Sequence, residues 1–267
     1  MKPFLFLDTA FETPTYFILY LLAFLGASVL AAHRAPTYGL SSVRAIDLGI
    51  CAFIGGFLGA RIFHILFEAP SYYFSEPLRI FYFWQGGFVL FGGLSFGILL
   101  SWIFLKLKNE PIGRWADLAA PSVLLGIGIG RVGCLATGCC YGSVTDWWWG
   151  LVFSEPGTPA PLGVSLHPTQ ILESLFGFLS ALFFLIIFRK PPKKSGSAFL
   201  LAMISYGLFR FAIEFLRGDS DRGLYLDGQI STSQILALLT VMICFIWLMK
   251  LKKQPESSKN IEEHSHS

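Results

Sequence analysis

Seven long apolar runs dominate this chain of 267 residues and constrain its fold more than any other feature. They lie at about residues 15–32, 46–67, 87–105, 118–137, 170–188, 197–216 and 232–249. A helix needs roughly 20 mostly apolar residues to cross the hydrocarbon core of a bilayer. Only 14% of the residues are charged and the mean hydropathy is +0.61, which is far from the composition of a soluble domain. We therefore predict an all-α integral membrane protein of about seven transmembrane helices.

The chain shows no tandem repeat and no separate soluble domain. We predict a single transmembrane domain over residues 1–251 and a disordered cytoplasmic tail over residues 252–267, which is polar and lacks aromatic residues. The first apolar run has no small-residue cleavage site after it, so we expect it to remain as a helix. The formal charge of +3 is too small to predict a nucleic-acid partner.

Lysine and arginine are unevenly divided between the two sides of the predicted membrane domain. The segments on one side, including the tail, hold thirteen of these cations, whereas the other side holds four, namely Lys2, Arg79, Arg217 and Arg222. Cytoplasmic loops carry the excess of positive charge, so we expect the N-terminus outside and the C-terminus in the cytoplasm. The long connection 139–168 has no Lys or Arg and contains three consecutive tryptophans, which predicts an interfacial segment on the outer surface, either as an anchor or as a lid.

Three arginines, Arg61, Arg131 and Arg210, fall inside the predicted spans. Each costs about 2.5 kcal/mol or more to bury without a partner. Each lies in the outer third of its span, so together they predict a binding site for an anionic lipid headgroup. The alternative is that they snorkel to the outer interface or bridge helices through carboxylates such as Glu173 and Glu214. Glu214 follows Arg210 at the i,i+4 spacing of an ion pair.

Two histidines and several glycines lie near this layer of arginines. His64 follows Arg61 by three residues, and His167 precedes the fifth span; either is a candidate proton acceptor, or simply an interfacial or capping residue. Gly92 and Gly93 in the third run either let two helices approach closely or leave room for a lipid phosphate or glycerol. The sequence does not separate these two uses.

Motifs distributed along the membrane region carry a resemblance to a known family. They are, in chain order, Tyr16–Tyr20, Asp47, Phe57–Arg61, Trp84–Gly87, Phe91–Leu94, Gly130–Gly133, His167–Gln170, Glu173, Tyr206–Arg210, Glu214 and Arg217. Single motifs are weak, but their order and topology together are specific. The chain resembles the bacterial prolipoprotein diacylglyceryl transferases.

The resemblance implies an enzyme of the bacterial cytoplasmic membrane, with its active site toward the outer side. The implied reaction transfers the diacylglyceryl group of phosphatidylglycerol to the lipobox cysteine of a prolipoprotein and releases glycerol phosphate. The implied partners are phosphatidylglycerol, prolipoprotein signal peptides and membrane lipids, and no cofactor or metal is implied. Arg131 and Arg210 match the family's essential arginines, and Tyr16, Gly142 and Glu214 match site positions that orient the headgroup or the arginines.

The chain departs from the family pattern at three positions. Phe91 stands where the family has a histidine, Cys134 where it has an asparagine, and Cys139 where it has a glutamate. If a histidine base is required, the resemblance implies that His64 or His167 replaces it. Otherwise the acceptor thiol ionises through its proximity to the arginines.

Five cysteines raise a separate set of alternatives. Cys134, Cys139 and Cys140 lie in one short stretch rich in glycine, where they are inert packing residues, members of a disulfide, or metal ligands. The spacing along the sequence makes a metal site the last of these alternatives, because no His or Cys pair at the spacing of metal ligands completes it. Cys51 and Cys244 are single residues inside spans and are expected in the core.

The leading hypothesis is therefore a lipoprotein-modifying transferase, or a related lipid transferase with another acceptor. A phospholipid-binding or phospholipid-translocating protein without chemistry is the main rival. A translocator should carry polar residues into the inner leaflet, but the inner halves of the spans are almost purely apolar. A redox sensor built on the cysteines is a third possibility, and it would not depend on the arginines.

Overall fold

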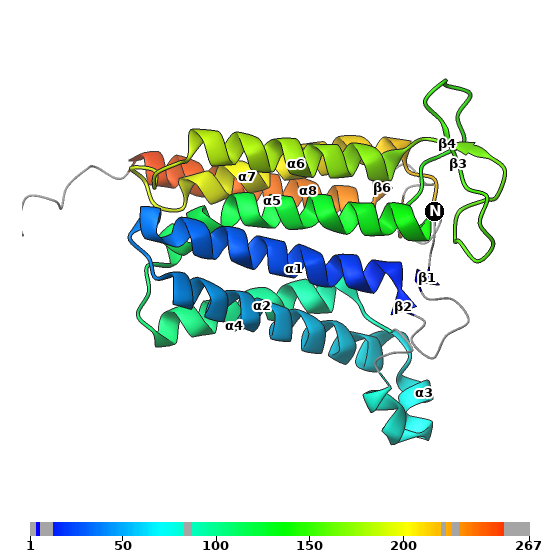
Figure 1. The fold of residues 1–267 in the computed structure, drawn as a ribbon, viewed down its shortest axis with the longest axis horizontal. Helices are drawn as coiled ribbons and strands as arrows, with labels where there is room; N and C mark the ends of the chain where they lie inside the picture. Colours follow the sequence, from blue (N-terminus) through cyan, green and yellow to red (C-terminus); the bar gives the residue numbers. More distant parts are fainter. Residues whose placement is uncertain (1–3, 6–12, 83–86, 220–222, 226–229, 254–267) are drawn as a thin grey trace, which may run out of the picture.

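The computed structural model describes residues 4–5, 13–82, 87–219, 223–225 and 230–253. Trp84 and Arg222, the N-terminal Lys2, and residues 254–267 of the predicted tail lie outside these ranges. The described part is built almost entirely from helices that run along the long axis of the molecule (Figure 1).

Seven long helices form the body of the part of the chain that the structure describes. They are α1 (Thr15–Arg34), α2 (Ser42–Phe63), α4 (Leu90–Leu107), α5 (Ile112–Thr137), α6 (Thr169–Ile187), α7 (Ser197–Ile213) and α8 (Thr232–Lys253). Six of them, all except α4, are long and apolar enough to cross a membrane. The apolar part of α4 spans Phe91–Leu107 and is shorter. The prediction of an all-α membrane protein is therefore confirmed with six helices of sufficient length. Each of the seven predicted apolar runs lies largely on one of the seven helices.

Short elements close the ends of the bundle. Helix α2 continues into a π-helical turn (His64–Glu68), and α3 (Pro70–Ser75) follows it. Three two-stranded antiparallel pairs join β1 (Phe4–Leu5) to β2 (Thr13–Pro14), β3 (Leu151–Val152) to β4 (Ser165–Leu166), and β5 (Leu224–Tyr225) to β6 (Ile230–Ser231). These strands are too short to change the fold class.

Two of the helices start earlier than their apolar runs suggest. Helix α2 begins at Ser42 rather than near residue 46, and α5 begins at Ile112 rather than near residue 118. Their first turns are polar, yet a helix satisfies its backbone hydrogen bonds in water as well as in lipid. Helix α8 runs to Lys253, so the first two residues of the predicted tail are helical.

The bundle consists of a pair of helices, α2 and α4, beside a larger group formed by α5, α6, α7 and α8, with α1 between them (Figure 1). Helix α1 packs against both α2 and α5. The start of α1, the end of α5, the start of α6 and the β3–β4 loop lie at one end of the bundle, and α8 ends at the other (Figure 1). We call the first of these the loop end.

Glycines set the close contact between α2 and α4. A Cβ on Gly92 would lie 2.3 Å from the carbonyl oxygen of Gly59, and a Cβ on Gly93 would lie 2.9 Å from that of Gly56. Such contacts leave no room for a side chain and are typical of packed transmembrane helices. Of the two uses predicted for Gly92 and Gly93, the structure therefore supports helix packing.

Buried polar contacts hold the end opposite the loop end. The carboxylate of Asp117 accepts hydrogen bonds from the backbone N–H groups of Gly196 (2.6 Å) and Phe199 (3.0 Å), at the start of α7. The guanidinium group of Arg34 donates to the carbonyl oxygen of Phe188 (2.6 Å), at the end of α6. These bonds satisfy groups that the helix ends would otherwise leave unpaired.

Candidate active site

A shared carboxylate joins three helices near the loop end. Glu173 on α6 contacts Arg131 on α5, with 3.1 Å between Oε2 and Nη1. It also contacts Arg210 on α7, with 3.4 Å between Oε1 and Nη1. The Glu173 side chain is 1% exposed, so the two guanidinium groups take the place of the water that would otherwise stabilise its negative charge.

Arg210 makes two further contacts that fix its guanidinium group. Its Nη1 lies 2.7 Å from Oε2 of Glu214, which confirms the predicted i,i+4 ion pair. Its Nη2 donates a 3.1 Å hydrogen bond to Oγ of Ser233 on α8. Helices α5, α6, α7 and α8 thus all contribute to one polar cluster, which we call the Glu173 cluster: Arg131, Glu173, Arg210, Glu214 and Ser233.

Close packing of α5 on α6 places this cluster. A Cβ on Gly177 would lie 2.7 Å from Cα of Gly128, so the two backbones touch one turn from Glu173. Ser174 strengthens the contact by donating a 2.9 Å hydrogen bond to the carbonyl oxygen of Gly128. The glycines of α5 therefore bring Arg131 within reach of α6.

Arg131 keeps donor capacity for a ligand. Among the described residues, its polar contacts all involve Nη1, which faces Glu173 and the Sγ of Cys134 at 3.9 Å. Its side chain is 16% exposed, compared with 12% for Arg210. The Nε and Nη2 groups can therefore donate to a phosphate while Nη1 stays in its ion pair.

The loop after α5 is fastened to the segment after α7. Gly142 forms an isolated antiparallel bridge with Arg217, and the backbone N–H of Ser143 donates to the carbonyl oxygen of Leu216 at 2.8 Å. A Cβ on Gly142 would lie 2.3 Å from the carbonyl oxygen of His167, so a larger residue does not fit. The predicted site position Gly142 thus has a clear structural role in holding Arg217 near the cluster.

Arg217 is a second arginine of this loop layer. It is 6% exposed and donates from Nε to Oδ1 of Asp219 at 2.7 Å, with a second contact from Nη2 to the other carboxylate oxygen. Burial is the largest single effect and opposes the charge, but the hydrogen bonds to Asp219 and the negative charges of Cys140, Asp219 and Glu173 together raise the pKa of Arg217 above its ordinary value. Arg217 stays charged beside the site.

Three cysteine sulfur atoms lie together beside Arg131. The Sγ atoms of Cys134, Cys139 and Cys140 all lie within 4.8 Å of one another. All five cysteines of the chain are free thiols in the structure, so the disulfide considered above is not formed. The ranking of a metal site in last place rested on linear spacing, whereas the turn after α5 folds two of the thiols back onto the helix end.

The turn that carries these thiols has an unusual backbone. Gly138 ends α5 in the left-handed region with φ 74°, and Cys140 adopts φ 57°, which is uncommon for a residue with a side chain. Side chains from the first turn of α6 hold this turn. Oγ1 of Thr169 donates to the carbonyl oxygen of Cys140, and Nε2 of Gln170 donates to that of Cys139, both at 2.9 Å.

The surroundings of Cys140 favour its thiolate form. Hydrogen bonds from the two neighbouring thiols lower the pKa of Cys140 well below its ordinary value. Burial opposes the thiolate, and the positive charges of Arg131 and Arg217 favour it, each by less than the effect of burial.

Arg61 and His64 lie on the α2–α4 side of the molecule, away from Glu173 and its helices. The Arg61 guanidinium group donates to the backbone carbonyl oxygens of Arg79 (3.0 Å), Gly87 (3.2 Å) and Ile80 (3.3 Å). Nδ1 of His64 lies 2.8 Å from Oε2 of Glu68. The expected gathering of three arginines is therefore met by Arg131 and Arg210 but not by Arg61, because backbone carbonyls of the loop between α3 and α4 hold it.

The remaining predicted site residues lie near the Glu173 cluster or at its edge. Tyr16 starts α1 and packs on Gly133, next to Cys134, with 3.1 Å between its ring and a Cβ placed on Gly133. His167 lies at the start of α6, and its Nδ1 atom is buried without a hydrogen bond to any described residue. Phe91 is 49% exposed on the first turn of α4 and has no proton to exchange.

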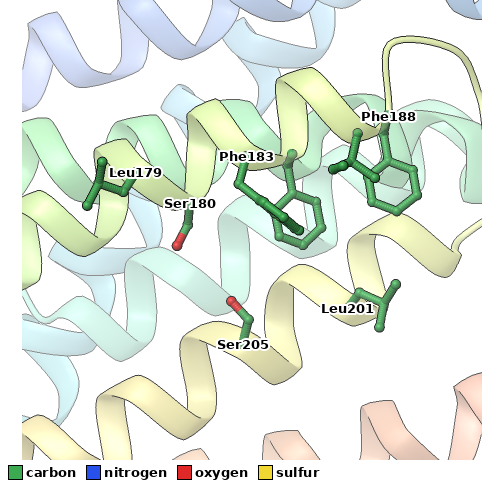
Figure 2. Close-up of a pocket in the computed structure, with 8 residues that line it drawn as sticks. Leu179, Ser180, Phe183, Phe188, Leu201 and Ser205 are labelled. Carbon is green, nitrogen blue, oxygen red and sulfur yellow. The ribbon is translucent and has the colours of Figure 1, made fainter.

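Two apolar grooves open on the outside of the larger helix group. One has a volume of about 490 Å³ and lies between α6 and α7, where Ser180 and Ser205 point toward each other across it (Figure 2). The other has a volume of about 330 Å³ and is lined by Phe211 of α7 and Leu238 of α8, among others. Two residues that line the second groove, Phe211 and Gln234, directly follow Arg210 and Ser233 of the Glu173 cluster in the chain.

Sequence reasoning identified Arg131, Arg210, Glu214 and Gly142. It counted Arg217 as a loop cation and named it among the family motifs, but it gave Arg217 no role in the site. It also named Glu173 only as a carboxylate able to bridge helices. The structure shows that this bridging carboxylate is the centre of the cluster.

Comparisons with known proteins agree with the motifs. The family profile for prolipoprotein diacylglyceryl transferase matches residues 3–250. Relatives named phosphatidylglycerol–prolipoprotein diacylglyceryl transferase include one from Clostridium tetani, 35% identical over 91% of this chain and 95% of its own length. Another from Photobacterium profundum is 36% identical over 91% of each chain. A third from Geobacter sulfurreducens is 35% identical over 83% of this chain and 84% of its own.

Proposed function

The chain belongs to the prolipoprotein diacylglyceryl transferase family, and from this premise we propose that it transfers the diacylglyceryl group of phosphatidylglycerol to the lipobox cysteine of prolipoproteins. The observation that carries the proposal is the Glu173 cluster, in which Arg131 and Arg210 share one buried carboxylate. Two arginines at this level suit an anionic phosphodiester, and they sit where the family's essential arginines match this sequence.

The reaction moves negative charge onto the departing phosphate. The acceptor sulfur forms a bond to the glyceryl carbon that carries the phosphate ester, and the carbon–oxygen bond to that phosphate breaks. Glycerol phosphate then leaves with one more negative charge than the phosphodiester had. Arg131, whose Nε and Nη2 groups are not used by described residues, supports this charge directly, and such donors contribute most when they are held in place beforehand.

Glu173 and Glu214 are positioning residues in this scheme. Glu173 holds Arg131 and Arg210 at 3.1 and 3.4 Å, and Glu214 holds Arg210 at 2.7 Å. Their negative charges also keep the empty site close to neutral, which lowers the cost of placing arginines inside a membrane.

The groove between α7 and α8 is the proposed place of an acyl chain of the phospholipid. Its lining is apolar and includes Phe211, Phe215 and Leu238. Because Phe211 and Gln234 of the groove directly follow Arg210 and Ser233 in the chain, a lipid whose phosphate meets the arginines can lay one chain along it. The same arrangement leaves the loop end open for the acceptor peptide.

We assign the protein to the bacterial cytoplasmic membrane with seven transmembrane helices, the N-terminus outside and the loop end facing outward. The unequal loop charges support this orientation. Trp147 and Trp149 stack with 5.1 Å between ring centroids, and Trp148 is 92% exposed, as expected for an interfacial anchor. Signal peptides of prolipoproteins would approach Arg131 from this side.

The test uses protein purified in detergent, phosphatidylglycerol and a synthetic lipobox peptide. Thioether product and released glycerol phosphate are measured for the native chain, Arg131→Ala, Arg210→Ala and a control, Arg44→Ala. Arg44 is half exposed and lies on the first turn of α2, which starts at the end of the bundle opposite the loop end (Figure 1). We expect both site variants to lose at least about 100-fold in rate and the control to retain native rates.

Two outcomes would contradict the proposal. Folded native protein that binds phosphatidylglycerol but forms no product would instead support a binding or translocating role. Product formation that survives in both arginine variants would show that the Glu173 cluster does not act on the phosphate.

A further inference from the structure

The cluster of Cys134, Cys139 and Cys140 has no role in the function proposed so far. Its three Sγ atoms lie within 4.8 Å of one another, and among the described residues no other His, Cys, Asp or Glu joins the group. A tetrahedral zinc ion bound at about 2.3 Å places its sulfur ligands about 3.8 Å apart. Each pair of sulfur atoms therefore has to close by about 1 Å at most, which side-chain rotation can supply.

The backbone around these thiols is held in the manner of a ligand loop. Cys134 lies on the last turn of α5, and the left-handed residues Gly138 and Cys140 fold the following segment back over it. Thr169 and Gln170, which are 0% and 1% exposed, fix the carbonyl oxygens of the two later cysteines. Uncommon backbone conformations of this kind persist where surrounding contacts fix them, often at functional sites.

The surroundings also suit an anionic metal–thiolate group. Nη1 of Arg131 lies 3.9 Å from Sγ of Cys134, and Arg217 is held across the loop by its bridge to Gly142. Three thiolates and one divalent cation carry a net charge of −1. Arg131 and Arg217 place positive charge next to this group, and they stay protonated at any physiological pH.

We propose that Cys134, Cys139 and Cys140 bind one Zn²⁺ through their thiolates, and that its open fourth position takes the thiol of the acceptor cysteine. Three protein ligands with an open fourth position are typical of catalytic zinc sites, whereas structural sites are closed by four. The inference rests on the proposed transferase function, because that function supplies a thiol as the acceptor.

A bound zinc ion would replace the general base that the acceptor thiol otherwise needs. Phe91 cannot act as a base, and His64 follows α2 on the α2–α4 side of the molecule, away from Glu173 and its helices. Binding to zinc deprotonates a thiol outright, so the acceptor sulfur does not need a general base next to it. The ion also holds the acceptor beside Arg131, at the level where the phosphate of the donor lipid would lie.

The step balances without an oxidant or reductant. The acceptor thiol binds the zinc ion and releases its proton to water. The sulfur then forms a bond to the glyceryl carbon of the lipid while the carbon–oxygen bond to phosphate breaks, and the electron pair of that bond leaves with glycerol phosphate. The product is a thioether, a weaker zinc ligand than a thiolate, so it leaves the fourth position to the next acceptor.

The first test is metal binding, measured with Co²⁺ alone on chelator-treated, reduced protein in detergent. We expect one Co²⁺ per chain with the visible absorption bands of tetrahedral thiolate-bound cobalt, and competition by Zn²⁺. Cys139→Ser and Cys140→Ser should weaken binding at least about 100-fold, more than the loss of an outer-shell contact would cause. Cys51→Ser and Cys244→Ser are the matched controls and should keep the native spectrum, because both thiols lie elsewhere.

The second test addresses the fourth position. A lipobox peptide with cysteine should shift the cobalt bands, and the same peptide with serine should not. Chelator-treated enzyme should lose thioether formation and regain it with Zn²⁺. Arg210→Ala should keep the cobalt spectrum while it loses transfer, which separates metal binding from phosphate binding.

The outcomes distinguish this inference from the function on which it rests. Full transfer by metal-free protein without cobalt bands would overturn the zinc site and leave the transferase intact. Cobalt bands that ignore the cysteine peptide would overturn the assigned fourth position. No transfer under any condition would remove the proposed function, while the spectra of native protein and cysteine variants would still decide whether the metal site exists. A disulfide among the three cysteines in fully active enzyme would overturn the zinc site as well.

Discussion

Replacement of Glu173 by glutamine tests the centre of the Glu173 cluster. Glu173→Gln keeps the size of the side chain but removes the charge that Arg131 and Arg210 share at 3.1 and 3.4 Å. Breaking a buried ion pair from one side costs about 3–5 kcal/mol, because the other charge stays buried. Arg210 keeps Glu214 at 2.7 Å, so we expect the lower end of that range, about 3 kcal/mol.

The assay is reversible unfolding in mixed detergent micelles, followed by circular dichroism, for the native chain and Glu173→Gln. Ser174→Ala is the matched control, because it removes a neutral buried hydrogen bond one residue away and should cost only about 1 kcal/mol. A double-mutant cycle with Arg210→Gln should give a coupling energy of about 1.5 kcal/mol or more. A loss below about 0.5 kcal/mol with no coupling would refute the ion-pair reasoning.

Three further changes test other parts of the structure. Asp117→Asn replaces one of two carboxylate acceptors at the start of α7 with a donor, so stability should fall by about 2 kcal/mol in the same unfolding assay, while transfer activity at the distant loop end stays native. Gly92→Ala puts a Cβ 2.3 Å from the carbonyl oxygen of Gly59 and should cost about 2 kcal/mol; unchanged stability would contradict the α2–α4 contact. Leu238→Trp fills the groove between α7 and α8, so KM for phosphatidylglycerol should rise about fivefold in steady-state assays with kcat kept, and an unchanged KM would exclude an acyl chain there.

The cysteine cluster shows why part of the site could not be predicted. The motif resemblance aligned Cys134 and Cys139 with family positions, but it could not say how far apart their sulfur atoms lie. That distance depends on the left-handed conformations of Gly138 and Cys140 and on the hydrogen bonds from the start of α6. The contacts join residues about thirty positions apart, and local sequence patterns carry no signal of such pairing.

The arginines also show what the sequence could not predict, namely the partner of each buried cation. The position of Arg61 in the outer third of its span is as suggestive as that of Arg131, yet the backbone carbonyls of a loop hold Arg61 and an acidic side chain holds Arg131. A backbone carbonyl is present at every residue, so sequence cannot identify it as the partner of a buried cation. The ion pair of Arg210 and Glu214 was predictable, because helix geometry alone brings i and i+4 together.

By itself, the sequence determined that the chain forms long apolar helices, where each helix lies within a few residues, and which family its motifs resemble. These properties are local, because the cost of placing backbone and side chains in lipid is set residue by residue. The tertiary structure alone decided that α5, α6, α7 and α8 share the Glu173 cluster, that Arg61 stays outside it, and that three thiols meet beside Arg131. Those outcomes depend on which helix faces touch, and close backbone contacts such as that of Gly128 with Gly177 select those faces.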